Sequence, residues 1–368
     1  MQTRIALTVI ACVGIVAGLV GAGIDPANPG KYEVLDPVTA GALTVFPVTG
    51  QAIPGAGNLL TLDEGLHSGE VIVTEHGRVN GLRRQRPGVW PEYPWSQITT
   101  VRGGGAQVNQ LTLVNNSKRP LVLLAGEIVS GGKQDRVVGK DRIVGPLSEV
   151  DLGVFCVEPH RWNQVTENFN AFPSAMVQPS VRRQAMVAQD QQAVWDQVAQ
   201  ARDEMKGFVP SARMAIEASS SYAQAVEAAP VKRELAATVA PIEQRFQELG
   251  ARLRDRKALG VVVAVHGRIV WADVFADPGL FNRYWPKLVR SYAAEAMSGF
   301  DARTHEKQDK QDARAFLNNL TAVRETSDGE PGLFRVTELT GTDFEAFVLT
   351  ALLPQTGYNV HFTKMARF

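Results

Sequence analysis

The chain has 368 residues, of which 45% are hydrophobic and 21% are charged, so it can form two or three globular domains with a substantial core. Lysine plus arginine and aspartate plus glutamate both number 38, and this balance gives no charge excess to direct the chain toward nucleic acid or an acidic membrane surface. The sequence contains no Walker loop, GxSxG or HExxH motif and identifies no cofactor, and its six scattered histidines argue against a histidine-built metal site.

The first 24 residues are typical of a signal peptide or of an uncleaved membrane anchor. Arg4 precedes a stretch of apolar or small residues at 5–24, and Pro and Gly mark residues 25–39 as a linker. We therefore expect an exported protein, periplasmic or extracellular, whose only membrane contact is an uncleaved segment 5–24. Cleavage would leave Cys156 as the last cysteine, in a context (DLGVFCVE) that favours a buried core thiol over a nucleophile.

Residues 40–178 have the pattern of a β-rich domain, and we predict an α+β fold in which this domain is sandwich-like. Short runs of β-branched residues alternate with turn sequences such as NNSKRP and GPLS. Three predicted strands, 121–129, 136–144 and 148–158, have short connections and should form an up-down-up meander.

The second half of the chain is predicted to be helical and then mixed. Apolar residues recur at helical spacing in 179–257, where Pro241 should kink or split a helix. Residues 258–368 form a mixed α+β part that packs on the rest. It should begin with a hairpin that turns at His266-Gly267, followed by a helix that Asp277 caps and whose first turn contains Pro278.

The predicted meander brings charged residues to one edge of the β-rich domain. Alternation places Glu127 and Glu158 on the same faces as the apolar residues of their strands, at the strand ends. The first and third strands end where the second begins, so one patch should form there. Its expected members are Glu127, Lys133, Gln134, Arg136, Glu158, Arg161 and Trp162.

Two interpretations of this patch remain open. In the structural one, the carboxylates and cations pair with each other and close the end of the β-domain. In the functional one, Lys133, Arg136 and Arg161 bind an anionic group, Gln134 orients it, and Trp162 stacks on it. Glu127 or Glu158 would then be the catalytic acid or base.

A second candidate patch lies in RIVWADVF. Trp271, Asp273 and Phe275 share one face of the predicted strand, so an acid lies between two aromatic residues. A buried carboxylate needs a partner, and Lys287 or Arg290 on the following helix could supply it.

Several separated motifs resemble a bacterial family of unknown function. They are LLAGEIVSGGKQDRVV, FCVEPHRW and WADVFADPGLFNRYWPKLVRSYAAEA, and the likeness runs from about Ala40 to Phe368. The family is named for its gene-neighbourhood association with ADP-ribosylglycohydrolases and the rhodanese–phosphatase superfamily. That name implies a neighbourhood of ADP-ribose chemistry and identifies no reaction.

The leading functional hypothesis is recognition of a small anionic molecule, such as a nucleotide or an ADP-ribose derivative. If the protein is an enzyme, the hypothesis is that it hydrolyses this molecule. The alternative is a non-catalytic binding or structural module of the cell envelope. A concave pocket at the charged edge would favour the first hypothesis, and a flat apolar or aromatic patch elsewhere would favour the second. The sequence does not decide whether the protein is an enzyme.

Overall fold

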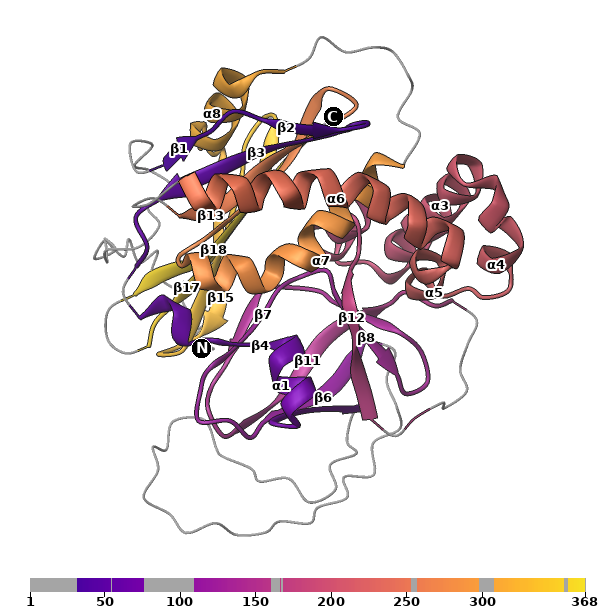
Figure 1. The fold of residues 1–368 in the computed structure, drawn as a ribbon. Coiled ribbons are helices and arrows are strands. Elements are labelled where there is room, and N and C mark those ends of the chain that lie inside the picture. The colour runs from indigo at the N-terminus through magenta and orange to yellow at the C-terminus, as the bar shows by residue number, and fades with distance from the viewer. Residues whose placement is uncertain are drawn as a thin grey trace, which may run out of the picture.

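The computed structural model shows an α+β protein in which a large β-sheet and a smaller β-unit are joined by helices (Figure 1). The residues it describes are 32–53, 55–75, 109–159, 166, 168–252, 257–297, 308–353 and 357–367. The predicted leader at residues 1–24 lies outside these ranges. Among the described helices, none is long and apolar enough to cross a membrane.

The large sheet has nine strands in the order β1-β3-β13-β14-β18-β17-β16-β15, with β2 also paired to β3. These strands are β1 (Tyr32–Val34), β2 (Val38–Ala40), β3 (Leu43–Gly50), β13 (Ala258–Val265), β14 (Arg268–Phe275), β15 (Arg324–Glu330), β16 (Phe334–Thr340), β17 (Phe344–Ala351) and β18 (Tyr358–Ala366). His266 and Gly267 both have positive φ angles between β13 and β14, which confirms the predicted hairpin. Both faces of this hairpin are buried because alternate side chains enter two different apolar cores: Trp271 enters one, and Ala272 enters the other.

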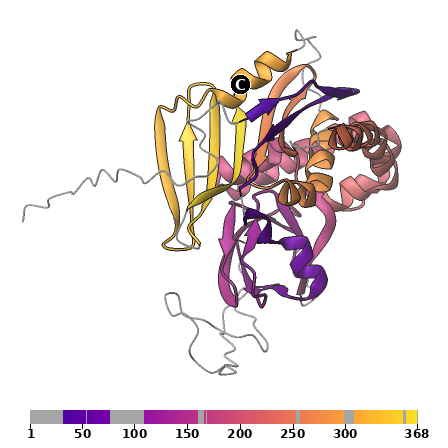
Figure 2. The same cartoon turned by 60° about the vertical axis from the view of Figure 1, so that its left-hand side comes forward.

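The N-terminal strands belong to this C-terminal sheet, and Figure 2 shows the indigo strands at one side of it, separated from the yellow strands by the orange ones. β3 pairs antiparallel with β13, from Leu43 opposite Val265 to Thr49 opposite Ala258. The sequence placed residues 25–39 in a linker and grouped 43–50 with the β-rich domain. The first described strands thus join a sheet whose other members come more than 200 residues later, which no local pattern indicates.

The smaller β-unit is a closed barrel in the order β11-β6-β5-β12-β8-β9, in place of the expected sandwich-like domain. Its strands are β5 (Val71–Glu75), β6 (Gln110–Asn115), β8 (Glu127–Gly131), β9 (Arg136–Val138), β11 (Ser148–Cys156) and β12 (Asn168–Met176). Beside it lies a three-stranded sheet of β4 (Leu60–Thr61), β7 (Leu121–Leu123) and β10 (Arg142–Val144). The two share one apolar core, which includes Val73, Leu113 and Leu123.

Two predicted strands are divided between the barrel and the small sheet. The predicted strand 121–129 forms β7 and β8, and the predicted strand 136–144 forms β9 and β10. β8 pairs with β9 and β9 with β11 in the barrel, as the meander predicts, whereas β7 pairs with β10 outside it. Gly126 has a φ of +94° at the break between β7 and β8. A residue with a Cβ rarely adopts that conformation.

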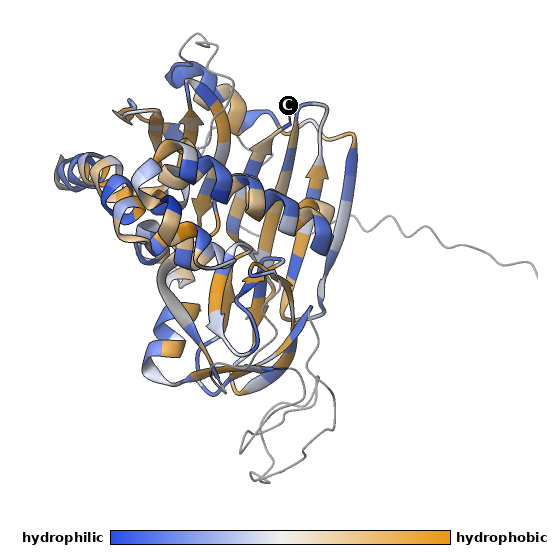
Figure 3. Ribbon diagram, turned by 90° about the vertical axis from the view of Figure 1, so that its right-hand side faces the viewer, coloured by the Kyte–Doolittle hydropathy of each residue, from blue (hydrophilic) through white to orange (hydrophobic). Residues whose placement is uncertain are grey.

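The helices lie between and beside the two β-units. They are α1 (Leu62–Ser68), α2 (Pro179–Arg183), α3 (Gln191–Phe208), α4 (Arg213–Glu217), α5 (Tyr222–Glu227), α6 (Ala229–Arg252), α7 (Pro278–Ala296) and α8 (Lys310–Asn318). Short 3-10 turns occur at Ala56–Asn58 and Pro210–Ala212, and a π-helical turn occurs at Gln184–Ala188. α6 continues through Pro241, so the helix is not split there. Figure 3 shows both hydrophobic and hydrophilic residues along the strands of the large sheet.

α7 lies between the large sheet and the barrel, because it contacts both β13 and β12 (Figure 1). Asp277 caps its start by accepting a hydrogen bond from the Leu280 amide at 2.9 Å, which confirms the predicted N-cap. The helix buries aromatic residues toward both units, including Phe281, Tyr284 and Tyr292.

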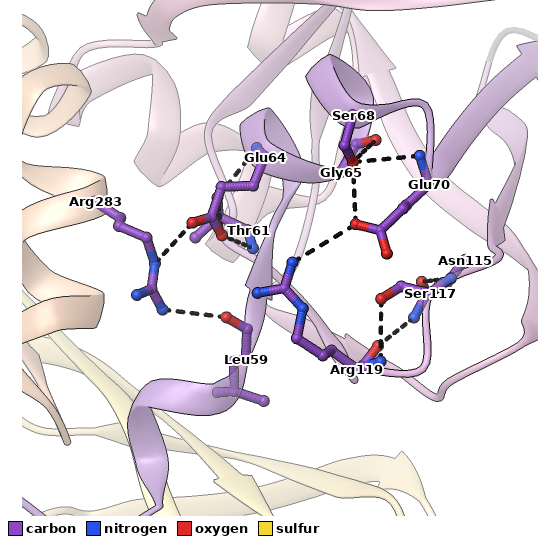
Figure 4. Close-up of polar contacts among 10 residues, drawn as sticks. All are labelled: Leu59, Thr61, Glu64, Gly65, Ser68, Glu70, Asn115, Ser117, Arg119 and Arg283. Atoms are coloured by element: carbon purple, nitrogen blue, oxygen red, sulfur yellow. Dashed lines mark hydrogen bonds and ion pairs between the residues drawn. The ribbon is translucent and has the colours of Figure 1, made fainter.

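Polar contacts of Arg283 fasten α7 to the segment that leads into the barrel (Figure 4). α1 begins with a capping box in which the Thr61 and Glu64 side chains each accept a hydrogen bond from the backbone of the other. The Nε atom of Arg283 lies 3.5 Å from Glu64 Oε1, and its Nη2 donates to the Leu59 carbonyl at 3.1 Å. Because β5 follows α1 directly, these contacts fix the barrel entrance against α7.

Candidate functional site

Glu127, the first predicted catalytic residue, lies at the junction between the barrel and α7. Its side chain is buried, with Oε1 at 2.7 Å from Lys287 Nζ and Oε2 accepting from the Leu124 amide at 2.7 Å. Lys287 also lies 2.7 Å from Asp63 Oδ2, so two carboxylates share one ammonium group. Burial raises the pKa of Glu127. Burial also opposes the charge on Lys287, but the two carboxylates outweigh it and raise the pKa of that ammonium group.

The structure does not bring Glu127 and Glu158 together. Val129 pairs with Arg136 in the barrel register, so Glu127 lies at the far end of β8 from the loop that connects β8 to β9. Glu158 lies at that loop, where its Oε2 accepts a hydrogen bond from the Asp135 amide at 3.1 Å. The break at Gly126 is the physical reason, because Glu127 begins a new strand there instead of ending the previous one.

The loop between β8 and β9 bonds mainly to its own barrel end and to the helical segment. Gln134 Nε2 donates to the Glu158 carbonyl at 3.1 Å, and Asp135 Oδ2 accepts from the Ser221 hydroxyl at 2.6 Å. Gln134, Asp135 and Glu158 are buried, whereas Lys133 is half-buried. These hydrogen bonds close the end of the barrel, and the pairing of carboxylates with cations that the structural interpretation expects there stays a prediction.

Arg136 is fully buried and pairs with Cys156 in the barrel register. The Cys156 thiol is free and buried, which confirms its predicted place in the core, and burial raises its pKa. Arg161 and Trp162 lie outside the described residues, so their roles as ligand-binding residues stay predictions.

The second predicted patch forms a buried hydrogen-bond network around Asp273 of β14. Asp273 Oδ2 accepts from Arg182 Nη1 at 2.8 Å, from Trp271 Nε1 at 2.9 Å and from the Tyr292 hydroxyl. Burial by itself would raise the pKa of Asp273, but Arg182 and the hydrogen bonds outweigh it and hold that pKa well below its usual range.

Arg182 therefore takes the place of the partner that the sequence favoured. Lys287 pairs with Glu127, and Arg290 pairs with Glu227 at 2.7 Å, so neither contacts Asp273. Arg182 comes from α2, 91 residues before Asp273 in the chain. A Cβ at Gly126 would lie 2.9 Å from Arg182 Cγ, so this glycine also makes room for the arginine stem.

His361 of β18 extends the network to a second carboxylate. Its Nδ1 lies 2.6 Å from Asp141 Oδ2 and its Nε2 lies 3.0 Å from Asp273 Oδ1, and all three side chains are buried. A neutral imidazole has one N–H and can donate to only one of these oxygens. Two hydrogen bonds require one additional proton. Burial opposes the charged imidazole, but the two carboxylates outweigh it and raise the pKa of His361.

Asp141 connects this network to Glu127 through the backbone. The consecutive amides of Leu124 and Ala125 donate to Glu127 Oε2 at 2.7 Å and to Asp141 Oδ1 at 2.8 Å. The short turn between β7 and β8 thus holds two buried carboxylates that belong to different ion-pair groups.

Asp141 also lines a cavity of about 670 Å³ between the barrel and the outer strands of the large sheet. Its apolar walls include Phe155 and Met186 on one side and Phe334 and Phe347 on the other. None of the described members of the predicted patch lines this cavity. Within the described part of the chain, no group of three or more His, Cys, Asp or Glu residues is placed to hold a metal ion.

The sequence interpretation missed Asp141, His361 and Arg182. One signal was present, because KQDRVV at 133–138 and GKDRIV at 139–144 repeat an Asp-Arg-apolar-Val pattern six residues apart. The first Asp-Arg pair lies at the barrel end, and the second faces the cavity. No local pattern marks His361, which is 220 residues from Asp141.

Comparison with known proteins assigns the chain to a family. The family model described as the ARG and Rhodanese-Phosphatase-superfamily-associated Protein domain, ARPP-1, matches residues 31–365. This range contains the barrel, the helices and nearly all of the large sheet, and it agrees with the resemblance seen in the sequence motifs. No curated protein and no solved structure matches the chain. Because the match covers nearly the whole chain, this protein belongs to the ARG and Rhodanese-Phosphatase-superfamily-associated Protein family.

Proposed function

We propose that this protein recognises a small molecule in the cavity between the barrel and the large sheet. The observation that carries the proposal is the cavity itself, whose volume of about 670 Å³ is within the usual range for small-molecule sites. Aromatic walls and a few convergent polar groups, here Asp141, Lys140 and Arg142, are the usual composition of such a site. Recognition requires no catalytic residue, and we include none in the proposal.

Recognition of a nucleotide or an ADP-ribose derivative at the predicted anion patch is supported by fewer features of the structure than binding in the cavity. Arg136, one of the three cations predicted to bind the anion, is fully buried, and the amides of Gly132 and Lys133 donate to the side chains of Thr166 and Glu75. Hydrolysis with Glu127 as the acid or base also receives less support, because Glu127 lies at the opposite end of β8 from the loop that contains Lys133 and Gln134. The alternative of a non-catalytic structural module fits the buried ion-pair network but gives no role to the cavity.

A cavity-filling variant tests the proposal. Gly153 lines the cavity, and a Cβ at this position meets no heavy atom within 4 Å, so Gly153→Leu should fill part of the space without disturbing the backbone. Gly207→Leu is the matched control, because Gly207 also has no heavy atom within 4 Å but lies on α3, away from the cavity.

The measurement is a thermal-shift screen of the full-length protein against nucleotides, ADP-ribose, sugar phosphates, aromatic amines and divalent cations. A ligand at about 100 times its dissociation constant should stabilise the native state by about 2.7 kcal/mol. Gly153→Leu should lose this stabilisation, and Gly207→Leu should keep it. A ligand that stabilises Gly153→Leu as well as the unmodified protein would place the site elsewhere, and the absence of any stabilising ligand would favour the structural module.

A further inference from the structure

The charges that line the cavity indicate which chemical class of ligand it takes. This inference rests on the proposed function, namely that the cavity binds a small molecule. We infer that the ligand is an organic cation, with a protonated amine or guanidinium group attached to an apolar or aromatic body.

The two cations of the cavity wall are already paired. Lys140 Nζ lies 3.6 Å from Asp328 Oδ2, and Arg142 Nη2 lies 3.5 Å from Glu330 Oε2. Both pairs cross the cavity, from the loop and strand after β9 to the edge strand β15. An anionic ligand would therefore have to separate Lys140 or Arg142 from a carboxylate that already neutralises it.

Glu338 supplies a carboxylate that faces the same cavity. It lies on β16 at two-residue spacing from Phe334 and Val336, and all three line the cavity, so they share one face of the strand. Among the residues that the structure describes, Glu338 has no hydrogen-bond or ion-pair partner. Since Lys140, Arg142 and Asp141 each have an oppositely charged partner, Glu338 is the carboxylate of the described lining that is left for a ligand.

One aromatic residue lies directly across from this carboxylate, and a second lies four residues away on the same strand face. Phe347 is the direct cross-strand partner of Glu338 on β17, and directly opposite side chains on one sheet face lie about 4.5–5.5 Å apart. Phe334 already accepts a cation, since the Arg142 guanidinium carbon lies 5.7 Å from its ring centroid. Aromatic rings attract organic cations, and a neighbouring carboxylate adds Coulombic attraction.

The test uses three probes with one aromatic body and different charges: 2-naphthylmethylamine, 2-naphthalenemethanol and 2-naphthoate. Dissociation constants are measured with the full-length protein from the methyl NMR signal of Met186, which lines the cavity. We expect the amine to bind at least about tenfold more tightly than the carboxylate.

Glu338→Gln should weaken binding of the amine about tenfold and change binding of the alcohol by less than about twofold. Glu325→Gln is the matched control, because Glu325 lies on the neighbouring strand β15, is exposed and does not line the cavity. It should leave all three dissociation constants unchanged.

Tighter binding of naphthoate than of the amine would overturn the inferred charge class and would leave the cavity as the binding site. Equal amine binding by the unmodified protein and Glu338→Gln would also overturn the inference. If none of the probes shifts the Met186 signal, the inference fails, and the separate screen with Gly153→Leu decides whether the cavity binds any ligand.

Discussion

Replacing Lys287 with methionine tests whether the ion pair between Lys287 and Glu127 stabilises the fold. Lys287 is 3% exposed and neutralises Glu127, whose side chain is 1% exposed, at 2.7 Å. Removing the ammonium group leaves a buried carboxylate whose remaining hydrogen-bond donor is the Leu124 amide. We therefore expect Lys287→Met to lower the free energy of unfolding by about 3–5 kcal/mol.

Nearly all of this loss should come from Glu127. Asp63, the second partner of Lys287, is 37% exposed, so water screens it and its contribution should be only about 0–1 kcal/mol. The double variant Lys287→Met with Glu127→Gln should recover part of the stability, because it removes the unpaired charge and keeps an oxygen acceptor for the Leu124 amide. Since protonation neutralises Glu127, the loss in Lys287→Met should also be smaller at pH 5 than at pH 8.

The measurement is equilibrium unfolding in urea, followed by circular dichroism. Lys232→Met is the matched control: Lys232 also lies 2.7 Å from a carboxylate, that of Glu227, but its side chain is 55% exposed. We expect this control to lose about 0–1 kcal/mol. If Lys287→Met loses no more stability than Lys232→Met, the junction does not depend on this ion pair and the argument from burial fails.

Three further predictions concern single residues. Because folding raises the pKa of His361, its protonation stabilises the folded state below about pH 6.5, and this contribution should disappear as pH rises through the folded-state pKa. The free energy of unfolding, measured in urea at a series of pH values, should therefore fall over that range. His361→Gln should reduce this fall. Gly126→Ala should destabilise by more than about 1 kcal/mol, because φ is +94° and the new Cβ would contact Arg182; an unchanged urea midpoint would contradict this. Cys156 should react with a thiol reagent only as fast as the native protein opens, since its thiol is buried; rapid labelling would return it to the candidate nucleophiles.

Features that depend on neighbouring residues could be predicted from the sequence. The hairpin at His266-Gly267 and the helix start at Asp277 follow from turn and capping chemistry within a few residues. The α+β class follows from the two hydrophobic periodicities. The burial of Cys156 follows from the apolar alternation of its strand.

Features that depend on long-range pairing could not be predicted. The closure of the barrel places β9 between β8 and β11, and the sequence shows the strands without showing which of them close a ring. The sequence predicts the partner of Asp273 on the next helix, but Arg182 comes from the preceding helical segment and His361 from the last strand. The predicted strand 121–129 is interrupted at Gly126, so Glu127 begins a new strand instead of lying near the end of the predicted one. Glu127 is therefore separated from Glu158.

The position of Asp141 in both the network and the cavity wall links ligand binding to protonation. Asp141 contacts His361 at 2.6 Å and is among the residues that line the cavity, so a cation bound in the cavity weakens the negative field that raises the His361 pKa. Binding of a cation should then release a proton, and by reciprocity the affinity should increase as pH rises through the raised pKa of His361. A (2-naphthylmethyl)trimethylammonium probe is suitable for this measurement, because its quaternary ammonium group keeps the same charge at every pH. His361→Gln should abolish the pH dependence of its dissociation constant. A dissociation constant that does not change with pH in the unmodified protein would show that the cavity and the buried network act independently.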